Sequence, residues 1–101
     1  MAESRIEETG HGSWLVVGDL SFATVPDLRG ALDINSADRA RISIDLGGVT
    51  RADSAGLALL IEWLREAERL DKIITFLNMP AQMQSIARVC GLDGILPSGG
   101  G

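Results

Sequence analysis

Apolar and polar residues recur along the chain with a period of two in some segments and of three to four in others. Residues 41–46 alternate most strictly, which predicts a β-strand, and the pair Gly47-Gly48 after them predicts the beginning of a loop. Residues 5–8 and 14–17 are also prone to form strands. Because the turn-forming segment 9–13 lies between these two stretches, we expect a β-hairpin at the start of the chain.

Three further segments have the period of helices. The clearest is 54–70, whose polar face carries opposite charges at i,i+3 spacing. Residues 24–32 predict a short helix with Thr24 as its cap, and 80–90 predict a last helix that a glycine terminates. We expect one more strand, at 72–77, between the last two helices. The apolar face of the longest helix consists of Leu57, Leu60, Ile61, Leu64 and Ala67.

The expected order of elements is ββαβαβα. This order is typical of an α/β domain in which helices cover a small mixed β-sheet, here of about four strands. The chain has 101 residues, which is the length of one domain. We therefore assign residues 1–97 to a single domain and the glycine-rich end, 98–101, to a flexible tail.

The burial of three apolar side chains on the predicted helices bears on function. Leu59 and Trp63 fall at the boundary of the long helix, one turn apart. Packing at the edge of the core and a patch that faces a partner both account for this position, and both interpretations stay open. Cys90 continues the apolar face of the last helix, so we expect a buried thiol and not a nucleophile.

The net charge of the chain is −5, with a pI near 4.6. Nine Lys and Arg against 14 Asp and Glu leave no basic stripe, which argues against binding of nucleic acid or of an anionic membrane surface. The longest apolar run, 56–61, is far shorter than the ~20 residues that span a bilayer. Since the first five residues lack the apolar region of a secretory signal, we expect a cytoplasmic protein.

The sequence offers few groups for catalysis or metal binding. Cys90 and His11 are the single Cys and the single His, whereas a structural zinc site takes four such ligands. A single Cys also suits a reducing compartment. No phosphate-binding or dinucleotide-binding loop is present, and His11 is distant in sequence from Ser54, the one candidate nucleophile. We therefore expect no enzyme activity, no metal, no cofactor and no small-molecule substrate.

The segment Asp53-Ser54-Ala55-Gly56, between a strand and the long helix, has features that capping explains only in part. Ser54 is a good helix cap, and the carboxylate of Asp53 favours the positive end of the helix dipole. Gly56 in the first helical turn costs about 1 kcal/mol relative to alanine, which close approach of another backbone would justify. A structural cap and a contact site for a partner are both compatible with these residues.

Two motifs resemble the STAS domain family, which is named after sulfate transporters and anti-sigma factor antagonists. The segment Gly18-Asp19-Leu20-Ser21 is similar to the turn that precedes the first helix of the family. The segment Asp53-Ser54-Ala55-Gly56-Leu57 is similar to the family signature Asp-[Ser/Thr]-x-Gly-Leu. The resemblance covers nearly the whole chain and implies the STAS fold.

Within this family, the runs Gly56–Leu60 and 90–97 are more similar to the STAS subunits of Mla-type phospholipid-transport ABC complexes of Gram-negative bacteria. That resemblance implies a non-catalytic partner of the transporter's ATPase subunit, held beside the inner membrane through its complex. The alternative is an anti-sigma factor antagonist, in which an anti-sigma factor kinase phosphorylates Ser54. Antagonists usually have Ser and Gly where this chain has Ala55 and Ala58. A dimerising scaffold is a third possibility.

Both main interpretations imply a partner at the start of the long helix and at the turn 18–24. Leu57 is expected in the core. A phosphate on Ser54 would add about −1.5 to −2 charge and would act as an off switch in the antagonist. Besides Ser54, the residues expected to contact the partner are Asp19, Ser21, Thr24, Asp53, Ala55, Gly56 and Leu59.

Overall fold

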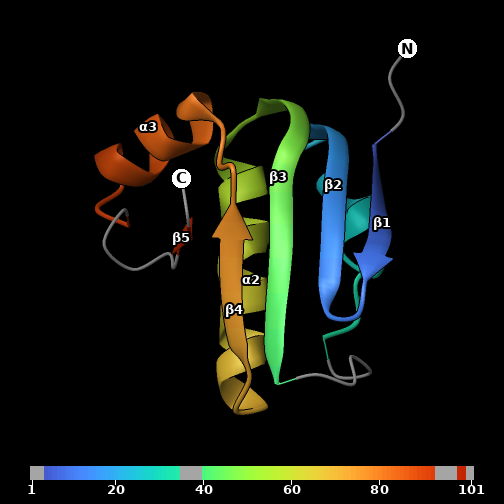
Figure 1. The fold of residues 1–101 in the computed structure, drawn as a ribbon. Helices are drawn as coiled ribbons and strands as arrows, with labels where there is room; N and C mark the ends of the chain where they lie inside the picture. Colours follow the sequence, from blue (N-terminus) through green and yellow to red (C-terminus); the bar gives the residue numbers. More distant parts are fainter. Residues whose placement is uncertain (1–3, 35–39, 93–97, 100–101) are drawn as a thin grey trace.

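A computed structural model describes residues 4–34, 40–92 and 98–99 of the chain (Figure 1). Its strands are β1 (Arg5–Gly10), β2 (Ser13–Leu20), β3 (Arg41–Ala52), β4 (Ile73–Leu77) and β5 (Ser98–Gly99). Its helices are α1 (Val25–Leu28), α2 (Ser54–Arg69) and α3 (Ala81–Val89). From β1 to α3 the elements follow in the expected order, so the predicted α/β fold is confirmed.

The strands form one mixed sheet in the order β1-β2-β3-β4-β5. β1 and β2 make the expected antiparallel hairpin, and β2 to β5 run parallel to one another. The two residues of β5, which the sequence assigns to a tail, pair with the end of β4. Residues 93–97, at the predicted end of the domain, and 100–101 lie outside the described residues. The carboxyl ends of β2, β3 and β4 meet at one edge of the sheet, the upper edge in Figure 1, and α1 and α2 lie behind it.

β3 has 12 residues and continues through Gly47 and Gly48, where the sequence predicts a loop. The register of β3 against β2 shifts at this position, which is the mark of a β-bulge. A Cβ at Gly48 would lie 2.7 Å from the backbone oxygen of Val16, so the two strands come closer than a side chain would allow. The paired glycines therefore belong to the interior of a strand, and the predicted loop is wrong.

The hydrophobic core lies between the sheet and the helices, and the alternating apolar residues of β3 are buried in it as predicted. On α2, Ile61 and Leu64 are only half-buried. Leu59 and Trp63 are instead 1% and 4% exposed, so the buried stripe is rotated toward them relative to the predicted face. Both side chains belong to the core and form no patch that faces a partner. The buried residues of α2 are Gly56, Leu57, Leu59, Leu60, Trp63 and Ala67.

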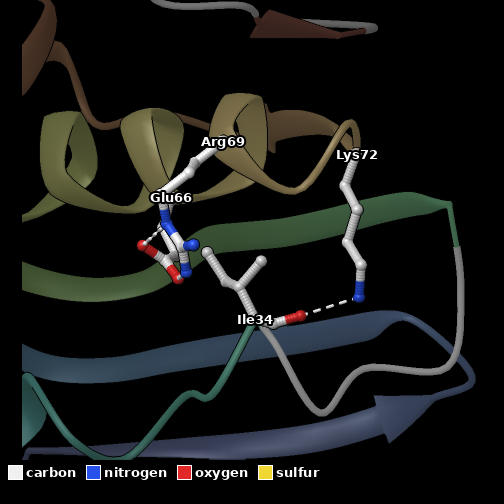
Figure 2. Close-up of polar contacts among 4 residues, drawn as sticks. All are labelled: Ile34, Glu66, Arg69 and Lys72. Carbon is white, nitrogen blue, oxygen red and sulfur yellow. Dashed lines mark hydrogen bonds and ion pairs between the residues drawn. The ribbon is translucent and has the colours of Figure 1, made fainter.

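The segment after α1 is held against the core by its own apolar side chains and by a hydrogen bond from Lys72. α1 has four residues, fewer than the predicted 24–32. The chain beyond it buries Leu32 and Ile34. Lys72, the only lysine, donates from Nζ to the backbone oxygen of Ile34 at 2.8 Å (Figure 2). Figure 2 also shows Arg69 paired with Glu66 on α2, one of the expected i,i+3 charge pairs.

α3 begins after Pro80 and ends before Gly91, whose φ of 73° lies in the left-handed region, as the predicted helix stop requires. Cys90 is exposed, so the expected buried thiol is wrong. Cys90 follows the last helical residue, Val89, whose side chain is itself 87% exposed, so the apolar face of α3 does not continue to Cys90. None of the helices in the described ranges is long and apolar enough to cross a membrane.

Candidate functional site

The start of α2 and the turn after β2 lie side by side at the carboxyl edge of the sheet. β2 ends at Leu20 and β3 at Ala52, and these two residues are partners in the parallel ladder. The backbone N–H of Asp53 donates to the backbone oxygen of Leu20 at 3.3 Å. Two motifs that are far apart in the sequence therefore form one surface. We call residues 19–24 and 53–55 the motif surface.

Asp53 is the N-cap of α2. Its Oδ2 accepts a hydrogen bond from the backbone N–H of Phe22 at 3.1 Å. Its Oδ1 accepts from the backbone N–H groups of Ala55 at 2.9 Å and of Gly56 at 3.4 Å. The bond from Phe22 contributes most to lowering the pKa of the Asp53 carboxyl, and the charge of Arg51 acts in the same direction. Asp53 is thus an ionised side chain that ties the helix to the turn.

Ser54 is not the cap that the sequence predicts but the first residue of α2. Asp53 takes the capping role because its backbone is extended, whereas that of Ser54 is already helical. Ser54 is exposed, and its side chain makes no hydrogen bond to any residue that the structure describes. Its hydroxyl is therefore accessible at a helix end that favours negative charge.

Thr24 fixes the turn between β2 and α1. Its Oγ1 accepts from the backbone N–H of Ser21 at 3.0 Å and donates to the backbone oxygen of Asp19 at 2.8 Å. This hydroxyl does not cap α1, contrary to the expectation from the sequence. The Oδ1 of Asp19 accepts from Thr50 of β3 at 3.4 Å. These half-buried residues hold the turn in shape beside β3.

Gly56 lies where α2 comes very close to β2. A Cβ at this position would lie 2.2 Å from the backbone oxygen of Leu20, so the close backbone approach predicted from this glycine is confirmed. Gly56 is buried, and Leu59, another residue expected to contact a partner, is 1% exposed. Because neither offers surface to a second protein, we remove both from the candidate contact residues.

Phe22 is a surface residue of this site that the sequence did not single out. Its side chain is 81% exposed in the turn beside the start of α2. The sequence signal that could have indicated its exposure is an aromatic residue between Ser21 and Ala23, inside a short turn. With Ala23 and Ser54 it forms the exposed part of the motif surface.

The motif surface contains no histidine that could act as a base for Ser54. His11 lies in the turn before β2, at the other end of an eight-residue strand that spans about 25 Å. Among the residues that the structure describes, no group of three or more His, Cys, Asp and Glu could hold a metal ion. An accessible hydroxyl, a bound carboxylate and an exposed aromatic ring are suited to contact with another protein.

Comparison with known proteins identifies relatives. The family model described as "Mlab, STAS domain" matches residues 5–97. The intermembrane phospholipid transport system binding protein MlaB of Haemophilus influenzae is 32% identical over 80 residues, which are 75% of this chain and 76% of that protein.

Two solved structures have a similar fold. The anti-sigma factor antagonist SpoIIAA in its unphosphorylated form gives a TM-score of 0.64 at 16% identity, over 98% of this chain and 89% of that one. The Bacillus cell fate determinant SpoIIAA in the phosphorylated form gives 0.63 at 18% identity, over 97% and 92%. These structures support the fold, and the family model spans every strand from β1 to β4 and all three helices. The chain therefore belongs to the STAS domain family.

Proposed function

We propose that this chain is the non-catalytic STAS subunit that binds and supports the ATPase of a Mla-type phospholipid-transport ABC transporter. The likeness to MlaB over three quarters of both chains carries the proposal. The chemistry of the motif surface supports it, because the surface has no histidine to act as a base for Ser54 and the surrounding groups are arranged for contact. The chain would then lie beside the inner membrane through its complex.

In this proposal the ATPase subunit contacts the motif surface. Asp53 and Thr24 hold the backbone of that surface in place through four hydrogen bonds that cross between the turn, the helix and β2. A surface that is ordered before binding loses little conformational freedom in the complex, which favours affinity. The small side chains of Ser54 and Ala55 let a partner helix approach closely.

A second candidate is an anti-sigma factor antagonist whose partner is an anti-sigma factor kinase. The accessible hydroxyl of Ser54 favours this candidate, because a kinase can reach it without unfolding α2. A phosphate there would add about −1.5 to −2 charge beside the ionised Asp53 and would repel a closely packed partner.

The variant Ser54→Asp tests the contact separately from the fold. Burying an unpaired carboxylate beside Asp53 should weaken binding of the ATPase subunit about a hundredfold, whereas Ser54→Thr keeps the hydroxyl and should bind nearly normally. Since Asp53 is the cap, both variants should keep the free energy of unfolding within about 1 kcal/mol of the wild type. Affinity and thermal unfolding are measured on the same samples.

Co-expression with the membrane-spanning permease and the ATPase of the Mla-type transporter distinguishes the two candidate functions. The wild-type chain should co-purify with the transporter and raise its ATPase activity or its stability. Co-purification with a kinase, and with no ABC subunit, would select the antagonist. If Ser54→Asp binds the ATPase as tightly as the wild type, the contact does not include the start of α2.

A further inference from the structure

Phe22 is the feature of the motif surface that neither capping nor packing explains. The large hydrophobic side chains that are exposed in the described part of the chain are Phe22, Ile73 and Val89. Ile73 begins β4, at the opposite edge of the sheet, and Val89 ends α3. Of the three, Phe22 is the one that lies next to Ser54 and the start of α2.

The backbone that carries the Phe22 ring is fixed on both sides. The N–H of Phe22 donates to Oδ2 of Asp53 at 3.1 Å. Two residues later the chain is closed by Thr24 and Val25, whose N–H groups donate to the backbone oxygen of Ser21 at 3.0 and 2.8 Å. A large ring on an ordered backbone loses little freedom when it enters a partner, and such aromatic side chains are typical energetic centres of interfaces.

The surroundings of Phe22 indicate what would receive the ring. Its exposed neighbours Ala23 and Ser54 are small, so the ring is the group that projects. From Gly18 to Leu28 the chain has two aspartates and no Lys or Arg, and Asp53, on which the charge of Arg51 acts, adds a third carboxylate. Arg29, the next residue, is paired with Glu62. A complementary partner therefore offers an apolar pocket with Lys or Arg at its rim.

We propose that Phe22 is the anchor with which this chain recognises its ATPase partner, through an apolar pocket that basic residues surround. The proposal rests on the proposed function and deepens it. Ser54 controls whether the surfaces can approach, whereas Phe22 supplies the apolar area that is buried when they do. Charge complementarity favours a basic protein surface over a second copy of this chain, whose net charge is also −5.

Titration calorimetry with the purified ATPase subunit from the same organism tests the proposal. Phe22→Ala should weaken binding about 30-fold or more, and Phe22→Leu, which keeps an apolar side chain, by less than about tenfold. Val89→Ala is the matched control, because it removes an equally exposed apolar side chain from the end of α3, and it should bind within about twofold of the wild type. Thermal unfolding of all three variants should match the wild type, since the side chains are exposed.

Four results would overturn this assignment. Equal affinity of Phe22→Ala and the wild type would reject the anchor and leave the proposed function standing, whereas absence of wild-type binding to the ATPase would reject both. Self-association that Phe22→Ala abolishes, measured by sedimentation, would identify a second copy as the occupant. A lipid surface is the remaining alternative partner for the Phe22 ring, and vesicles of phosphatidylethanolamine and phosphatidylglycerol test it. Vesicle binding that depends on Phe22 would show that the ring contacts lipid.

Discussion

Among the helices that begin at the carboxyl edge of the sheet, α2 and α3 have first turns that are built differently. The carboxylate of Asp53 caps α2 and accepts three backbone N–H groups, one of them from the turn after β2. α3 begins after Pro80 without a side-chain cap bond. In its first turn, Gln82 instead accepts from the backbone N–H of Ala52 at 3.1 Å. The start of α2 is thus tied to the turn after β2 and, through the N–H of Asp53, to Leu20 of β2, whereas that of α3 is tied to the end of β3.

The position of a helix start can therefore be fixed by close backbone contact, as in α2, or by side-chain packing, as in α3. α2 has a glycine and a carboxylate that leave it a single position against β2. α3 relies on the burial of Met83 and Ala87, which tolerates small shifts. Comparable substitutions should therefore reduce the free energy of unfolding more at the start of α2 than in α3.

Gly56→Ala should have the largest effect. The added Cβ would lie 2.2 Å from the backbone oxygen of Leu20, and moving the helix to relieve that contact should reduce the free energy of unfolding by about 2–3 kcal/mol. Ser85→Ala, on the exposed side of α3, should change it by less than about 0.5 kcal/mol. Urea unfolding measures both. A Gly56→Ala protein that is instead more stable by about 1 kcal/mol would follow helix propensity alone and would show that α2 is not held against β2.

Asp53→Ala should have the next largest effect, because it removes the cap of α2 and the bond to Phe22. Losing an N-cap costs about 1–2 kcal/mol, whereas Asp53→Asn keeps a capping oxygen and should retain most of the stability. In the first turns of α3, Gln84→Ala should stay within about 0.5 kcal/mol of the wild type. Thermal unfolding compares the three. Equal losses for Asp53→Ala and Gln84→Ala would remove the difference between the two helix starts.

The charge of Asp53 should give the smallest effect, as a dependence of stability on pH. The folded protein lowers the pKa of this carboxyl below its unfolded value of about 3.9, so ionisation stabilises the fold above that value. The contribution is lost as the pH falls through the folded pKa. The free energy of unfolding of the wild type should therefore exceed that of Asp53→Asn by its largest amount above about pH 5, and this difference should shrink in acid. Arg69 also lowers the pKa of Glu66, but that pair is present in both proteins and cancels. If the difference in the free energy of unfolding between the wild type and Asp53→Asn stayed constant into acid, the charge of Asp53 would play no part in the cap.

Most of the fold could be predicted because each element has its own period. The alternation in 41–46 and the helical spacing in 54–70 are each several repeats long, so they are hard to mistake. The continuation of β3 could not be predicted, since a glycine pair is typical both of a turn and of a bulge, and the partner strand decides between them. The exposure of Cys90 likewise depends on how far the core extends under α3.

The candidate site was predictable as a location but not in its details. Asp53 and Ser54 are both good capping residues, and the backbone conformation of each decides which one caps. The burial of Leu59 depends on how α2 is rotated about its axis against the sheet, and the pattern of apolar residues on the helix did not determine that rotation. Phe22 could be assigned to the surface only once the turn and α2 were seen together.

Cys90 gives this chain a practical use as its own reporter. It is the only thiol, it is exposed, and it follows the last turn of α3. It follows the nine residues of α3, which span about 13 Å, and it belongs to neither of the two segments, 19–24 and 53–55, that form the motif surface. A maleimide dye would therefore attach at one known position outside the motif surface. The fluorescence anisotropy of that dye would then follow complex formation in the unmodified sequence, with no engineered cysteine.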